Sequence, residues 1–267
     1  MKYWVRSVLA AAITFIIVFF LKPPFLLFLL VGVPVLTVVI TIASFYYSFR
    51  STLQFGPIPQ QGYEDRLRAL DGMSAEWERQ GFARCDGFFL KMIPDSVTYV
   101  YKHRQHPTFG LAYHLGAKMS VDLVTRLAGD RSLTTNNSRD AGNIPRPAPK
   151  MLQVFPGTPL AGLWDEHQKA AAYLSSKGLA SADVSPAEFR PYFLKSLQEF
   201  KNYVLRMPFW PVKLVFWVVT RYGQRYCRRF EDQFQSGFLP SNGSPGRHDC
   251  GQRTENMSQL QECRNSS

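Results

Sequence analysis

Three histidines are the residues of this chain whose type and spacing come nearest to a chemical site. We expect His103 to end one strand, His106 to lie in the following turn and His114 to lie in the next strand, so their imidazoles could converge on a metal ion. The spacing matches no metal-binding helix such as HExxH, and no carboxylate stands in a fixed relation to it. The pattern therefore favours polar residues at strand ends, with a metal-dependent, hydrolase-like site as the alternative.

The other reactive residues form no catalytic motif. Cys85 has no partner that the sequence identifies, and the four cysteines form no CxxC pair, so we interpret them as reduced thiols. The chain contains no nucleophile elbow and no glycine-rich phosphate loop. His167 is predicted on the apolar face of a helix beside Trp164, as a hydrogen-bonded core residue. The sequence predicts no cofactor and favours a binding role over catalysis.

Two long apolar runs precede these residues. Residues 3–21 would make a helix of about 28 Å at 1.5 Å per residue, close to the thickness of a hydrocarbon core, and residues 25–49 are longer still. Trp4, Tyr46 and Tyr47 stand where interfacial aromatics stand in membrane helices. We therefore predict a transmembrane hairpin with two spans. A cleaved signal peptide is the alternative, but no small-residue cleavage site follows the first run.

The basic residues around the hairpin predict its orientation. Lys2 and Arg6 stand at one end, Arg50, Arg66 and Arg68 follow the other end, and the turn holds only Lys22. Because loops rich in Lys and Arg stay on the cytoplasmic side, we expect both termini in the cytoplasm. The predicted location is thus a membrane, crossed twice.

The chain after the hairpin shows the patterns of an α+β domain. Residues 51–62 hold two prolines and two glycines and are predicted to form a linker. Apolar residues at helical spacing follow, up to Gly81. From residue 87 to residue 135, short apolar or alternating runs are separated by turns, which predicts four or five antiparallel strands. Residues 136–156, rich in Pro and Asn, are predicted as a loop.

Helical patterns return after that loop. Thr158 stands before Pro159 as an N-cap, and Ser185 with Glu188 resembles a capping box. The order of helix, sheet and helices predicts a cytoplasmic α+β domain over residues 63–206, behind the hairpin of residues 1–50. Residues 233–267 are polar and are predicted to be a disordered tail.

A basic aromatic segment separates the domain from this tail. Residues 201–230 contain no acidic residue, and 208–219 are almost wholly apolar but too short to span a bilayer. We therefore predict an amphipathic helix over residues 207–232 that lies at the membrane interface. Its expected lipid contacts are Trp210, Lys213, Phe216, Trp217, Arg221, Arg225, Arg228 and Arg229. The alternative is a core helix with a solvated basic end.

The net charge of +11 indicates an anionic partner. A lipid bilayer with anionic headgroups is the favoured partner, and a protein partner or self-association is the next. The aromatics form one block and no RRM, KH or helix-turn-helix signature is present, which argues against nucleic acid. We therefore expect a non-catalytic interaction module held at a membrane surface. The alternatives are the hydrolase-like enzyme and an accessory subunit of a larger membrane complex.

Overall fold

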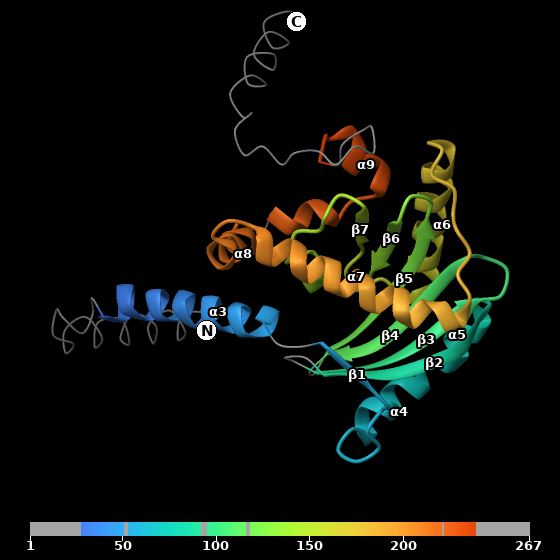
Figure 1. Cartoon of the computed structure of the whole chain (residues 1–267), viewed down its shortest axis with the longest axis horizontal. Coiled ribbons are helices and arrows are strands. Elements are labelled where there is room, and N and C mark those ends of the chain that lie inside the picture. The colour runs from blue at the N-terminus through green and yellow to red at the C-terminus, as the bar shows by residue number, and fades with distance from the viewer. Residues whose placement is uncertain (1–27, 51–52, 92–94, 116–117, 221, 239–267) are drawn as a thin grey trace, which may run out of the picture.

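A seven-stranded sheet lies at the centre of the domain, with helices on both of its faces (Figure 1). The structure is a computed structural model that describes residues 28–50, 53–91, 95–115, 118–220 and 222–238. The strands are β1 (Gln54–Gly56), β2 (Phe82–Lys91), β3 (Ser96–His103), β4 (Thr108–Leu115), β5 (Lys118–Leu127), β6 (Arg131–Asn136) and β7 (Lys150–Val154). They follow one another in chain order across the sheet. The pairs from β1 to β6 are antiparallel, and β7 joins β6 in parallel.

The helices connect and cover these strands. They are η1 (Phe28–Gly32), α3 (Val33–Arg50), α4 (Glu64–Gly72), α5 (Ser74–Arg79), η2 (Arg139–Gly142), α6 (Leu160–Ser176), α7 (Pro186–Arg206), α8 (Trp210–Val219), η3 (Tyr222–Tyr226) and α9 (Phe230–Gln235). Helices α4, α5 and α6 pack on one face of the sheet. Helix α7 packs on the other face, and α9 joins α6 against β5, β6 and β7.

Coverage of both faces explains why the strand residues do not simply alternate between buried and exposed. In β3, Val97, Tyr99 and Tyr101 face α4, α5 and α6, whereas Val100 faces α7, and all four are buried. A strand between two helical layers buries both of its sides. Burial on the two faces supplies the largest favourable contribution to the stability of the domain.

Local sequence signals set the start of α7. The Ser185 hydroxyl accepts a hydrogen bond from the backbone N–H of Glu188, whose side chain accepts from the backbone N–H of Ser185. This confirms the predicted capping box. Helix α6 begins one residue later than predicted, at Leu160, and Pro159 rather than Thr158 occupies its N-cap without a side-chain hydrogen bond. Proline at this position needs no donor partner, because it has no N–H.

The predicted sheet was too small and its topology was wrong in one place. The α+β class is correct, but the sheet is mixed, with seven strands rather than four or five antiparallel ones. β1 lies within the predicted linker and β7 within the predicted loop. Both strands are short and stand beside prolines, so their local sequence favours loops. Their pairing with β2 and β6 supplies the hydrogen bonds that make them strands.

The predicted transmembrane hairpin is also wrong. Within the described ranges, no helix is both long enough and apolar enough to cross a membrane. The first predicted span, residues 3–21, and Trp4 lie outside the described residues. In the second, residues 25–49, a π-helical turn ends at Gly32, and Tyr46, Tyr47 and Arg50 end α3. Helix α3 has 18 residues and is about 27 Å long at 1.5 Å per residue, against about 30 Å for a hydrocarbon core, and its last turn is not apolar.

The predicted location depends on that hairpin and is corrected with it. Without a described helix that crosses a membrane, the two-span, multi-pass membrane location with both termini in the cytoplasm is not supported. Helix α3 instead extends beside the domain, and the aromatic ring of Tyr46 stacks on Trp210 of α8 with centroids 6.0 Å apart (Figure 1). Tyr46 therefore takes part in a helix–helix contact.

Candidate functional site

The three candidate histidines do not meet. His103 lies opposite Phe82 at one end of the sheet, whereas His114 lies opposite Val97 and Met119 at the other. Only His103 and His106 are neighbours, with ring centroids 4.6 Å apart. In the part of the chain that the structure describes, no three His, Cys, Asp or Glu side chains are placed to hold a metal ion.

His103 has a structural environment. Its Nδ1 accepts hydrogen bonds from the backbone N–H groups of Gln105 and His106, at 3.0 and 3.1 Å, and so shapes the turn after β3. Its ring stacks on Trp164, with centroids 4.7 Å apart. Burial, and next the neighbouring His106, lower the pKa of His103 below its ordinary value. A neutral imidazole in this position organises the turn.

His167 is the most deeply buried of the histidines that the structure describes. Its Nε2 lies 2.8 Å from the Thr125 hydroxyl and its Nδ1 2.7 Å from the Thr135 hydroxyl, which also accepts from the Gln153 amide. Burial lowers the pKa of His167 to about 3. These contacts confirm the predicted hydrogen-bonded core histidine and tie α6 to β5, β6 and β7.

A second polar cluster fixes the chain where β6 ends. Asn136 is buried, and its amide donates hydrogen bonds to the Tyr113 hydroxyl, at 3.1 Å, and to the Asp122 carboxylate. Its carbonyl oxygen accepts from the backbone N–H of Ser138. Burial raises the pKa of Asp122, although the Asn136 hydrogen bond and the charge of Arg146 oppose that shift. Asn136 thereby determines the direction in which residues 137–146, here called the 137–146 loop, leave the sheet.

The far side of the 137–146 loop packs on η3 through two glycines. A Cβ on Gly223 would lie 1.9 Å from the carbonyl oxygen of Gly142, so only glycine allows this approach. The indole Nε1 of Trp217 donates to the same oxygen at 3.0 Å. The backbone N–H of Arg146 donates to the Tyr226 hydroxyl at 3.1 Å. The loop is therefore held at both of its ends.

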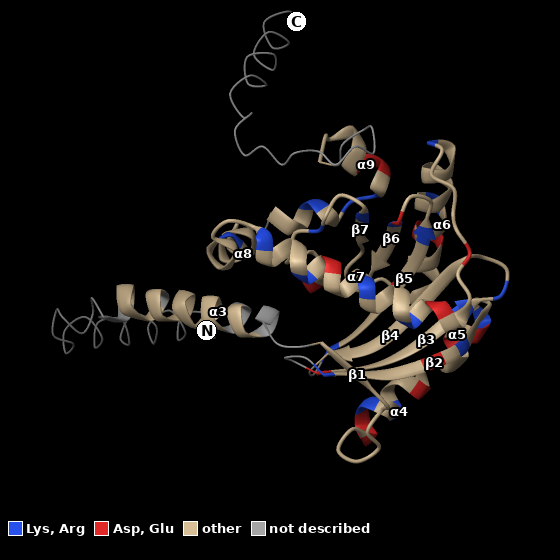
Figure 2. Ribbon diagram, viewed as in Figure 1, with Lys and Arg blue, Asp and Glu red and all other residues tan. Residues whose placement is uncertain are grey.

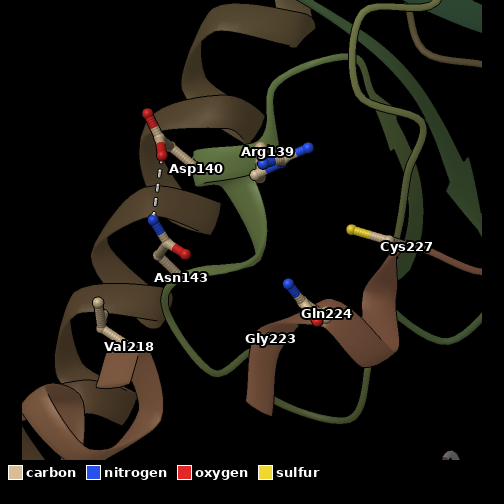
Figure 3. A pocket seen from close by; sticks show the side chains of 7 residues that line it. All are labelled: Arg139, Asp140, Asn143, Val218, Gly223, Gln224 and Cys227. Atoms are coloured by element: carbon tan, nitrogen blue, oxygen red, sulfur yellow. Dashed lines mark hydrogen bonds between the residues drawn. The ribbon is translucent and has the colours of Figure 1, made fainter. Parts of the chain in front are cut away.

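A cleft of about 270 Å³ lies between the 137–146 loop, the end of α8 and η3 (Figure 3). Its lining residues are Arg139, Asp140, Asn143, Val218, Gly223, Gln224 and Cys227. The Cys227 sulfur and the Gln224 amide point into the space beneath Arg139 (Figure 3). Burial raises the pKa of the Cys227 thiol, and the nearby Arg139 partly opposes that shift. The cleft combines a cation, amide groups and a protonated thiol.

The predicted lipid-contacting residues divide into outward and inward groups. Phe216, Lys213, Arg225 and Arg228 are exposed, whereas Trp210 is buried and Trp217 is half-buried. Arg229 makes a two-pronged ion pair with Glu166, at 2.9 and 3.0 Å. Arg221 lies outside the described residues.

Helix α8 presents an exposed apolar stripe, of which only Phe216 was predicted as a lipid contact. We define the α8 stripe as Phe209, Val212, Phe216 and Val219, whose side chains are between 57% and 82% exposed. Val212, Phe216 and Val219 are three and four residues apart, which places them on one face of the helix, and Phe209 stands just before them at the N-cap. That spacing is visible in the sequence, but it becomes informative only once α8 is known to begin at Trp210. The cleft residues had no such signal, because loop residues have no periodicity.

Comparison with known proteins adds no identification. No family model matches the chain, and neither the curated proteins nor the solved structures contain a significant match to it. The fold and the site define an α+β domain that carries an exposed apolar helix face beside a polar cleft.

Proposed function

We propose that this protein is a non-catalytic binding module that docks on the surface of an anionic lipid bilayer through the α8 stripe. The observation that carries the proposal is the exposure of three apolar side chains on one face of α8 and of Phe209 at its N-cap. Exposed apolar patches of this kind mark interaction sites. A helix of this type can lie in the interface with its apolar face in the acyl boundary. The proposal requires surface contact and no membrane-spanning helix.

The strained backbone conformation of Phe209 supports a functional role for the stripe. Its φ of +54° lies in the left-handed region, and 82% of its side chain is exposed. A bulky residue in that region is strained, at a cost on the order of 1–3 kcal/mol. The strained turn ends α7 and begins α8, so that Phe209 projects into solvent at the start of the stripe.

The charges near α8 favour an anionic surface. Lys213 lies on α8, Arg206 precedes it and Arg225 and Arg228 follow it, and all four are exposed. Figure 2 shows basic residues on and around α8. Each basic residue close to an anionic bilayer contributes about 1 kcal/mol. Exposed apolar residues of α3, such as Val35 and Val39, add to the apolar surface.

Replacement of Phe209 and Phe216 by serine is expected to lower binding of the full-length protein to phosphatidylserine vesicles more than ten-fold. Burial of each phenylalanine contributes roughly 1.5–3 kcal/mol, and about 1.4 kcal/mol corresponds to ten-fold in affinity. Co-sedimentation across a lipid titration measures the change. The matched control is Met119→Ser with Leu194→Ser, which removes two exposed apolar side chains outside the stripe and is expected to leave binding unchanged.

Equal partitioning of the stripe variant and the wild type would overturn the lipid proposal. A lower molecular mass of the stripe variant in light scattering, without a change in vesicle binding, would instead assign the stripe to self-association. Increasing salt is expected to weaken vesicle binding, because exposed cations are screened.

The hydrolase alternative receives no support from the site geometry. His114 stands at the opposite end of the sheet from His103, and both nitrogens of His167 lie within hydrogen-bonding distance of threonine hydroxyls inside the core. Substrate could not reach His167 without opening α6.

A further inference from the structure

The cleft beside the 137–146 loop is lined by one cation, Arg139, and one carboxylate, Asp140. Asp140 is its acidic residue, and that carboxylate is paired with the Lys118 ammonium at 2.5 Å and accepts from the Asn143 amide at 3.2 Å. The guanidinium of Arg139 has no ion-pair partner within the described ranges. One full positive charge therefore remains at the cleft wall.

The hydrogen-bonding groups that remain available are mainly donors. Arg139 presents five N–H groups in a planar fork, which suits a tetrahedral oxyanion. The side-chain amide of Gln224 makes no hydrogen bond to any described residue and points into the same space (Figure 3). A carboxylate beside these donors would compete for them, but Asp140 is already engaged by Lys118 and Asn143.

The walls of the cleft are preorganised. The Gly142–Gly223 approach, the Trp217 hydrogen bond and the Tyr226 hydrogen bond hold the 137–146 loop against η3. A rigid wall reduces the ordering cost of binding a small ligand. The volume of about 270 Å³ lies below that of pockets for drug-sized ligands and leaves space for a small organic group beside an anion.

We propose that this cleft binds a phosphate monoester, with the phosphate on Arg139 and Gln224 and the organic group toward Val218. The same chemistry is offered by a small soluble ester and by the headgroup of phosphatidic acid. Val218 belongs to α8, so the cleft stands beside the proposed lipid-docking helix. The inference does not depend on docking, since a soluble ester tests the cleft alone.

Alkylation of Cys227 reports on occupancy, because its thiol lines the cleft. Full-length protein is treated with iodoacetamide, and the rate of modification of each cysteine peptide is followed by mass spectrometry with and without glycerol 3-phosphate. The Cys227 rate is expected to fall about five-fold at four times the Kd, because protection equals 1 + [L]/Kd. Cys85, which is exposed and outside the cleft, is the internal control and is expected to keep its rate.

The variant Arg139→Gln is expected to lose this protection, whereas Arg104→Gln, the same change at an exposed arginine outside the cleft, is expected to keep it. Protection is compared as a ratio within each variant, because loss of Arg139 also changes the thiol. Inorganic phosphate replaces the ester in a parallel arm. Vesicles of phosphatidic acid are compared with vesicles of phosphatidylserine to detect a headgroup source.

Protection by the soluble ester that Arg139→Gln removes would support the cleft as a site for a soluble phosphate. Protection by phosphatidic acid vesicles alone, again lost in Arg139→Gln, would support the lipid headgroup. Absence of protection in every arm, or protection that persists in Arg139→Gln, would overturn the proposal. Neither of these two results would bear on binding through the α8 stripe, which the Phe209 and Phe216 variant tests separately.

Discussion

The substitution Gly110→Ala is expected to destabilise the domain by about 3 kcal/mol or more, because no space exists for one additional methyl group. A Cβ on Gly110 would lie 2.0 Å from the ring of Trp77. Trp77 is fully buried and stacks on Tyr101, with centroids 4.5 Å apart. The ring therefore cannot move without disturbing the layer between α5 and β3. Urea unfolding followed by circular dichroism measures the change in the free energy of unfolding.

The cause can be separated from a general effect of glycine replacement. Gly72→Ala is the control, because nothing lies within 4 Å of a Cβ there, and this variant is expected to be neutral or slightly stabilising. The double variant Gly110→Ala with Trp77→Leu is expected to lose less stability than the sum of the losses in the two single variants. Residues in contact couple in this way by roughly 0.5–3 kcal/mol. Simple additivity of the two single changes would show that the predicted clash is absent.

Acidification is expected to destabilise the domain through His167. Burial lowers the pKa of His167 to about 3 in the folded state, whereas an unfolded histidine titrates near 6.5. Between these pH values the unfolded state binds a proton that the folded state does not, so stability falls as the pH falls. The slope approaches 1.36 kcal/mol per pH unit, and the loss reaches about 3 kcal/mol at pH 4.

His167→Gln isolates this contribution. Glutamine keeps polar atoms between Thr125 and Thr135 but does not titrate, so the pH dependence of the variant is expected to be flatter than that of the wild type by about 3 kcal/mol between pH 7 and pH 4. His103, whose pKa is also lowered, stays in both proteins and cancels in the comparison. Parallel stability curves for the two proteins would contradict the assignment to His167.

Elements with strong local signals were predictable. The Ser185–Glu188 capping box and the apolar face of α6 around Trp164 and His167 are written in short-range spacing, and the structure contains both. β1 and β7 were missed because neither has enough residues to show a period, and prolines near both favour loops. The hairpin was predicted from hydropathy and from aromatic and basic residues at the ends of the apolar runs, and none of these registers the π-helical turn before α3 or the packing of Tyr46 on Trp210.

In the two candidate sites, the α8 stripe and the cleft, the sequence likewise left the arrangement of the side chains unspecified. The basic aromatic character of residues 207–232 is a property of composition, but which aromatics face outward is not. Trp210 and Trp217 lie inward, and Phe209 and Phe216 outward, because α7 and the 137–146 loop occupy one side of α8. The cleft joins residues that are about eighty positions apart in the chain, and no local pattern relates them.

The sequence alone determined the α+β class, the positive charge and the helices whose caps and periodicity are local, since these depend on neighbours within a few residues. Tertiary structure decided the rest: the seven-stranded mixed sheet, the separation of His103 from His114, the outward face of α8 and the cleft around Arg139. Each of these depends on contacts between segments distant in the chain. The energy of such contacts comes from burial and pairing, which the spacing of residue types along the chain does not specify.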